Sequence, residues 1–227
     1  ASVFMARDEL SVKLADIPPA LKETWQQGRW ALGGVTVTWL QDQSYIYLLS
    51  AMVSTAETAE ASAARLFLAP LTLLSVGFSR VLMPRWAYMA HEGKHQELID
   101  MANRVKWILV SMVVGYVAVL LLLKDWLTPL LLTKDYTQTG SLIVLWGVLF
   151  AIQAVRSNYS AQLQVFKRFR DITLANSATA IGVLLLGAVL IKSYGVRGSM
   201  VTMIIGEVAL AALLAYGFKN VRKNIAH

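Results

Sequence analysis

The stretch HEGKH, which runs from His91 to His95, matches the H-E-x-x-H pattern of zinc proteases, whose two histidines bind the metal while the glutamate acts as general base. Such a site needs one continuous helix, and Gly93 weakens a helix by about 1 kcal/mol relative to alanine. It also needs a third ligand, yet the only other histidine is His227. The stretch therefore favours a solvated interfacial segment, and we expect no enzymatic activity, metal or other cofactor.

Four ionisable side chains lie within otherwise apolar segments, where a charge is costly unless it faces a cavity or a partner: Asp42, Arg65, Arg156 and Glu207. Arg156 has the strongest pattern, because polar residues recur around it at spacings of three and four and so share one helix face. This polar stripe consists of Gln153, Arg156, Ser157, Ser160 and Gln164. Asp42 is flanked by Gln41 and Gln43.

Three of these ionisable residues also have a purely structural interpretation. Arg65 lies toward the end of its segment, where it could snorkel to the membrane surface as readily as face a cavity. Asp42 could pair with an arginine and hold two helices together. Glu207 is next to Gly206, and we expect it to be a buried packing residue with a hydroxyl partner such as Thr202.

The elements that must position these residues are membrane-spanning helices. With 56% hydrophobic and 15% charged residues and a mean hydropathy of +0.53, the chain is too apolar for an ordinary soluble domain. Six mainly apolar blocks, at 30–53, 62–83, 105–123, 141–163, 172–191 and 198–218, are each long enough to cross a hydrocarbon core of about 30 Å. Short polar connections separate them, such as STAETAEA at 54–61, KDWLTPLLLTKDYTQTG at 124–140, KRFRD at 167–171 and KSYGVRG at 192–198. The sequence predicts an all-α polytopic membrane protein with six antiparallel transmembrane helices.

Basic residues support one orientation of these helices, since lysine and arginine near span ends concentrate on the cytoplasmic side. With both chain ends inside, 14 of the 21 Lys and Arg residues fall in inner segments and 4 in outer loops. The formal charge of +7 then reflects topology and attraction to anionic membrane lipids, so we expect no nucleic-acid partner. The absence of cysteine excludes a disulfide framework.

The predicted organisation has three parts. Residues 1–29, with Pro18 and Pro19 breaking any helix near the middle, form a cytoplasmic linker. Residues 30–218 form the six-helix transmembrane region, and residues 219–227 form a cytoplasmic tail. Because the sequence opens with ASVFMARDEL, without an initiator methionine, we expect it to be a piece of a longer protein.

Several short motifs resemble one family of membrane proteins. The sequence has GRW at 28–30 before the first span, AARLFLAPL within 63–71, LMPR at 82–85 and EG at 92–93 in the following loop. In these motifs and their order the chain resembles the polysaccharide and O-antigen flippases of the multidrug, oligosaccharidyl-lipid and polysaccharide exporter superfamily, apart from the inserted Met83. The resemblance extends from about residue 26 onward.

The resemblance implies one six-helix lobe of a two-lobed transporter in the bacterial inner membrane, with an N-terminal six-helix lobe as its partner. Such a lobe would rock against the other and carry a lipid-linked oligosaccharide from the inner to the outer leaflet. Arg156 and Arg65 would pair with the pyrophosphate. Asp42 would respond to a coupling ion, H⁺ or Na⁺. Sugar hydroxyls would suit the amide and hydroxyl residues Gln153, Ser157, Ser160, Gln41 and Gln43.

Two other functions remain open at this point. A cation-coupled multidrug exporter of the same superfamily would also use Asp42, but its cationic substrates would be repelled by the arginines. A non-transporting membrane scaffold would bury the Arg156 stripe against another helix or protein. The net charge of the cavity separates the first two functions, and the presence of an enclosed polar space separates both from the third.

Overall fold

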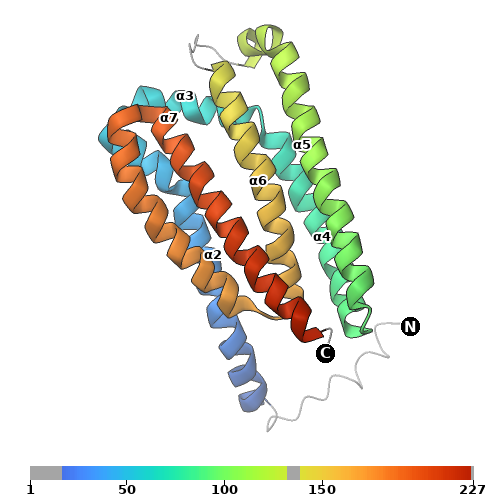
Figure 1. Cartoon of the computed structure of the whole chain (residues 1–227). Coiled ribbons are helices and arrows are strands. Elements are labelled where there is room, and N and C mark those ends of the chain that lie inside the picture. Colours follow the sequence, from blue (N-terminus) through green and yellow to red (C-terminus); the bar gives the residue numbers. More distant parts are fainter. Residues whose placement is uncertain (1–16, 132–138, 226–227) are drawn as a thin grey trace, which may run out of the picture.

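The computed structural model describes residues 17–131 and 139–225, and the elements in these two ranges are all helices (Figure 1). The predicted all-α class is confirmed. In chain order the helices are α2 (Ile17–Met52), α3 (Thr55–Leu66), α4 (Ala69–His91), α5 (His95–Leu131), α6 (Thr139–Val165) and α7 (Phe169–Ile225).

Helix α2 begins earlier than the sequence predicts. Pro18 and Pro19 lie in its first turn, where a missing N–H is harmless because the first N–H groups of a helix have no intrahelical partner. Whether they interrupt a helix depends on residues before Ile17, which lie outside the described part of the chain, but residues 17–29 of the predicted linker are helical. Further along, Gly34 lets α2 approach α7, since a Cβ there would lie 2.9 Å from Thr173 Oγ1. That hydroxyl donates to the carbonyl of Trp30 at 2.6 Å.

The predicted second span is divided into α3 and α4, which are bent by 53° relative to each other. Pro70, in the first turn of α4, has no N–H for the carbonyl four residues earlier, which favours a break between the two helices at this point. The segment STAETAEA was expected to be an outer loop, but most of it lies in α3. The hydroxyl of Ser54 accepts the N–H of Glu57 at 3.1 Å and so caps the first turn of α3.

Two tight turns connect the next helices, and both use a left-handed residue. Between α4 and α5, Gly93 has φ +74°, and the N–H of Lys94 donates to the carbonyl of Met89 at 2.9 Å. Between α6 and α7, Lys167 has φ +57°, and the N–H of Arg168 donates to the carbonyl of Leu163 at 2.9 Å. Such short turns make consecutive helices antiparallel neighbours.

Helix α7 consists of two helical arms joined by a sharp reversal, so that it folds back on itself (Figure 1). At Gly195 the backbone has φ 56° and ψ −133°, which divides α7 into a first arm up to Gly195 and a second arm after it. The two arms run in opposite directions. The segment KSYGVRG was predicted to be a loop between two spans, and the reversal does occur there, although only Gly195 leaves the helical conformation.

The helices have the surface of a membrane protein. Large apolar side chains are exposed around the bundle, among them Leu73 and Leu122, which are 74% and 83% exposed. The described residues contain three helices long and apolar enough to cross a membrane, or four if the bent pair α3 and α4 forms one span. One of the three is α7, which its fold at Gly195 divides into two arms. Six separate spans stay a prediction.

Candidate functional site

The polar stripe lies on α6 as predicted, and its members line two cavities on either side of Arg156. The first cavity, of about 390 Å³, lies among α3, α4, α5 and α6 and includes Gln153, Arg156 and Ser157. The second cavity, of about 380 Å³, lies among α2, α6 and the first arm of α7 and includes Arg156, Ser160 and Gln164. Arg156 therefore lines both cavities.

The first cavity is rich in positive charge and hydroxyl groups. Arg65 from α3, Arg80 from α4 and Arg156 from α6 supply three guanidinium groups, and the residues that line the cavity include no carboxylate. Hydroxyl groups come mainly from Thr72, Ser75, Ser79 and Ser157. Guanidinium groups are permanently charged and offer several N–H donors in one plane, which suits phosphate oxygens.

Arg65 is held at the wall of the first cavity by an aromatic ring. Its Cζ atom lies 5.2 Å from the centre of the Trp146 ring, within the range of a cation–π contact. Trp146 is itself only 1% exposed, and its Nε1 donates to the carbonyl of Ala61 at 3.0 Å. The ring is therefore fixed between α3 and α6. The sequence left open whether Arg65 extends to the membrane surface or faces a cavity, and in the structure its side chain lines the first cavity.

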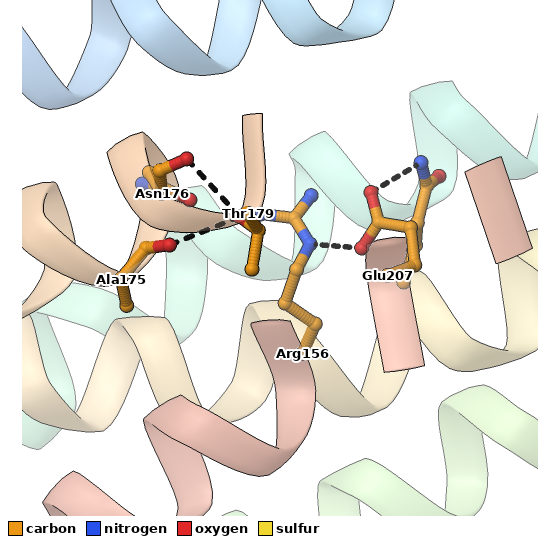
Figure 2. A network of polar contacts seen from close by, with 6 residues as sticks. Arg156, Ala175, Asn176, Thr179 and Glu207 are labelled. Carbon is orange, nitrogen blue, oxygen red and sulfur yellow. Dashed lines mark hydrogen bonds and ion pairs between the residues drawn. The ribbon is translucent and has the colours of Figure 1, made fainter. Parts of the chain in front are cut away.

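Arg156 forms a buried ion pair with the second arm of α7 (Figure 2). Its Nε lies 2.6 Å from Glu207 Oε2, and the two side chains are 14% and 5% exposed. The other carboxylate oxygen, Oε1, accepts a hydrogen bond from Gln153 Nε2 at 3.1 Å. The expected pairing of Glu207 with Thr202 was wrong, because the Thr202 hydroxyl donates to the carbonyl of Gly198 in its own helix.

The Nε atom makes this contact, which is a close ion pair whose geometry is not that of a hydrogen bond, and the guanidinium group has five N–H donors in all. The terminal nitrogens of Arg156 have no protein partner among the described residues, and Figure 2 shows the guanidinium group directed toward Asn176 and Thr179 on the first arm of α7. The Thr179 hydroxyl donates to the carbonyls of Ala175 and Asn176 at 3.0 Å each. Glu207 therefore orients Arg156, and among the described residues no other side chain bonds its terminal nitrogens.

The remaining predicted site residues lie on α2 and join neither cavity as far as the structure describes them. Gln43 is partly buried but lines neither the first nor the second cavity. The side chains of Gln41 and Asp42 lie outside the described residues, so the proposed coupling role of Asp42 stays a prediction.

The HEGKH stretch is the turn between α4 and α5. His91 ends α4, Gly93 reverses the chain and His95 begins α5, so the single helix that a zinc protease motif requires does not form. The Lys94 ammonium group lies 2.7 Å from Glu92 Oε2, and this hydrogen bond holds the pKa of the Glu92 carboxyl below its usual value. His95 packs against Phe166, with ring centres 5.6 Å apart.

Two site residues, Glu207 as the partner of Arg156 and Asn176 in the second cavity, were not predicted. Asn176 is 4% exposed, and its Oδ1 is buried with no hydrogen-bond partner among the described residues. The sequence contained a weak signal for a polar helix face here, because Thr173 and Asn176 are three residues apart near the start of the fifth apolar block.

Comparison of the chain with protein-family models, curated proteins and solved structures finds no match.

Proposed function

We propose that this chain is one six-helix lobe of a membrane transporter that moves a polyprenyl-pyrophosphate-linked oligosaccharide from the inner to the outer leaflet. The observation that carries the proposal is the first cavity, where Arg65, Arg80 and Arg156 line one space with several hydroxyl groups and no carboxylate. A diphosphate is the anionic group common to such lipid carriers. Its oxygens would accept charge-assisted hydrogen bonds from the three guanidinium groups.

The dimensions of the site support a headgroup that enters from the side while its lipid tail stays in the membrane. A cavity of about 390 Å³ falls within the range of small-molecule sites, which start near about 300 Å³. The helices around it expose large apolar side chains, among them Leu73 and Val81 of α4. A partner lobe, supplied by the same protein in this proposal, would complete the cavity and allow alternating access.

The two alternative functions are less well supported. A multidrug exporter for cations needs an acidic cavity, and the first cavity is basic. A scaffold would pack the α6 stripe against another helix. Arg156 and Gln153 do contact Glu207 of α7, but the stripe also lines two cavities, which a scaffold does not require.

The test replaces the ion pair as a unit, because removing Arg156 alone leaves a buried, unpaired Glu207 and destabilises the fold. In cells whose surface polysaccharide depends on this transporter, we expect Arg156→Leu combined with Glu207→Leu to lower exported glycan at least tenfold. The amount of protein in the membrane should stay the same. The matched control is Arg222→Ala, an exposed basic residue near the end of α7, which should leave export unchanged. Normal surface polysaccharide in the double variant would contradict the proposal.

A further inference from the structure

The second cavity differs chemically from the first. It lies between α2, α6 and the first arm of α7, and among the described residues that line it Arg156 is the one with a charged side chain. The other polar groups are hydroxyls and amides, from Thr38, Ser160, Gln164, Thr173 and Asn176. Two tryptophans, Trp30 and Trp39, complete the wall. Most of the polar side chains described in this lining are therefore uncharged.

Asn176 is the residue that indicates a ligand. It is 4% exposed, and its Oδ1 is buried without a hydrogen-bond partner among the described residues. Rotating the amide by 180° exchanges its oxygen and nitrogen, so the nitrogen would then occupy the unpaired position. One polar atom stays unpaired in either orientation. Buried polar groups in native proteins are nearly always satisfied, so an unsatisfied one in a cavity wall indicates that a water or a ligand group binds beside it.

The other polar groups of the second cavity mainly offer acceptors. The Gln164 Nε2 donates a hydrogen bond to Ser160 Oγ at 3.2 Å, which leaves the amide oxygen of Gln164 to accept a bond from a ligand. The hydroxyls of Thr38 and Thr173 donate to the carbonyls of Gly34 and Trp30, so their oxygens can only accept further bonds. Donors for a ligand come from Arg156, the Ser160 hydroxyl and the second N–H of the Gln164 amide.

A ligand for this cavity must therefore donate as well as accept hydrogen bonds. A sugar hydroxyl does both, whereas an ionised phosphate oxygen only accepts, and a cation would be repelled by Arg156. The Trp39 side chain is 56% exposed and offers an indole face to the C–H surface of a sugar ring. Trp30 is less available, because the guanidinium carbons of Arg29 and Arg170 lie 5.7 and 5.8 Å from its ring centre.

We infer that the second cavity binds an uncharged sugar of the lipid-linked substrate, while the first cavity binds the diphosphate. This inference rests on the proposed function and adds a separate glycan subsite to it. Arg156 lines both cavities, so it lies at the boundary between the charged and the uncharged part of the substrate. Asn176, Gln164 and Trp39 are then residues that determine which sugar is accepted.

The experiment measures sugar binding and diphosphate binding separately on the full chain purified in detergent. The probes are the methyl glycosides of glucose, galactose, mannose, rhamnose, N-acetylglucosamine and N-acetylgalactosamine, observed by saturation-transfer NMR, and inorganic pyrophosphate, observed by titration calorimetry. We expect at least one glycoside to bind, and to stay bound when pyrophosphate is added. Asn176→Leu keeps a similar side-chain volume and removes the unpaired polar atom. It should lower the affinity for that glycoside at least tenfold without changing the affinity for pyrophosphate.

A matched control comes from the first cavity. Ser75→Ala changes a hydroxyl that lines only the first cavity and should leave glycoside binding unchanged. The inference is overturned if no glycoside binds, if Asn176→Leu binds the glycoside as well as the unmodified chain does, or if pyrophosphate displaces the sugar. Failure of the proposed function gives a different result, in which pyrophosphate does not bind although the glycoside does.

Discussion

At the scale of single residues, the ion pair between Arg156 and Glu207 is the central feature of the site. Both side chains are largely withdrawn from solvent, and their closest atoms are 2.6 Å apart. Burying two charges is costly, and mutual attraction together with the hydrogen bond from Gln153 offsets that cost. The pair fixes the direction of the guanidinium group, so Arg156 needs little reordering when an anion enters the first cavity.

The pair predicts a distinct pattern of stability. Arg156→Ala leaves Glu207 buried and unpaired, and we expect it to lower the free energy of unfolding by about 3–5 kcal/mol. Arg156→Leu with Glu207→Leu should restore a stability close to that of the unmodified chain, because apolar side chains of similar volume replace the pair. Thermal unfolding followed by size-exclusion chromatography in detergent measures both. Equal losses in the single and the double variant would show that the pair does not act as a unit.

At the scale of elements, the fold of α7 on itself depends on Gly195 and on a carboxylate from α3. Gly195 has φ 56° and ψ −133°, a backbone conformation that residues with a Cβ atom rarely adopt. The N–H of Val196, the first residue of the second arm, donates to Glu57 Oε2 at 3.3 Å. Glu57 therefore satisfies one of the free N–H groups at the start of this arm and connects α3 to the reversal.

Replacing this glycine should destabilise the reversal. Gly195→Ala forces an unfavourable backbone conformation and places its Cβ 2.9 Å from Glu57 Oε2, so we expect a loss of about 1–3 kcal/mol in unfolding free energy. The matched control is Gly182→Ala in the first arm, where a Cβ would meet nothing within 4 Å. That change should stabilise the helix by about 0.5–1 kcal/mol. The interpretation fails if the two variants unfold at the same temperature.

At the scale of the whole molecule, the two ends of the bundle differ in charge. The turns from α4 to α5 and from α6 to α7 lie at the same end as the C-terminal part of α7, and α3 and the Gly195 reversal lie at the other (Figure 1). The first end carries a basic group of residues, consisting of Lys94, Lys167, Arg168, Arg170, Lys219, Arg222 and Lys223. A membrane that surrounds the apolar sides would place this basic end in the cytoplasm.

This orientation can be measured directly, because the sequence contains no cysteine. Single cysteines introduced by Lys94→Cys and Arg222→Cys should react with a membrane-impermeant maleimide only after the cells are permeabilised. Lys192→Cys, which is exposed near the Gly195 reversal, should react in intact cells. Labelling of Lys94→Cys from outside would contradict both the orientation and the proposed direction of transport.

The sequence by itself determined the helical class, the apolar surface, the turn at HEGKH and the polar stripe on α6. These features depend on local composition and on the helical period, and both can be read from neighbouring residues. The division of the predicted second span at Pro70 also has a local cause, although the length of the apolar block concealed it.

Only the tertiary structure decided what the stripe faces. Gln153 and Glu207 are 54 residues apart in the sequence, and their contact depends on how α6 and the second arm of α7 rotate against each other. The same holds for Asn176, whose side chain is buried beside α2 and α6 rather than exposed to the membrane. Helical spacing shows which residues share a face, but packing between distant segments selects the partner of that face.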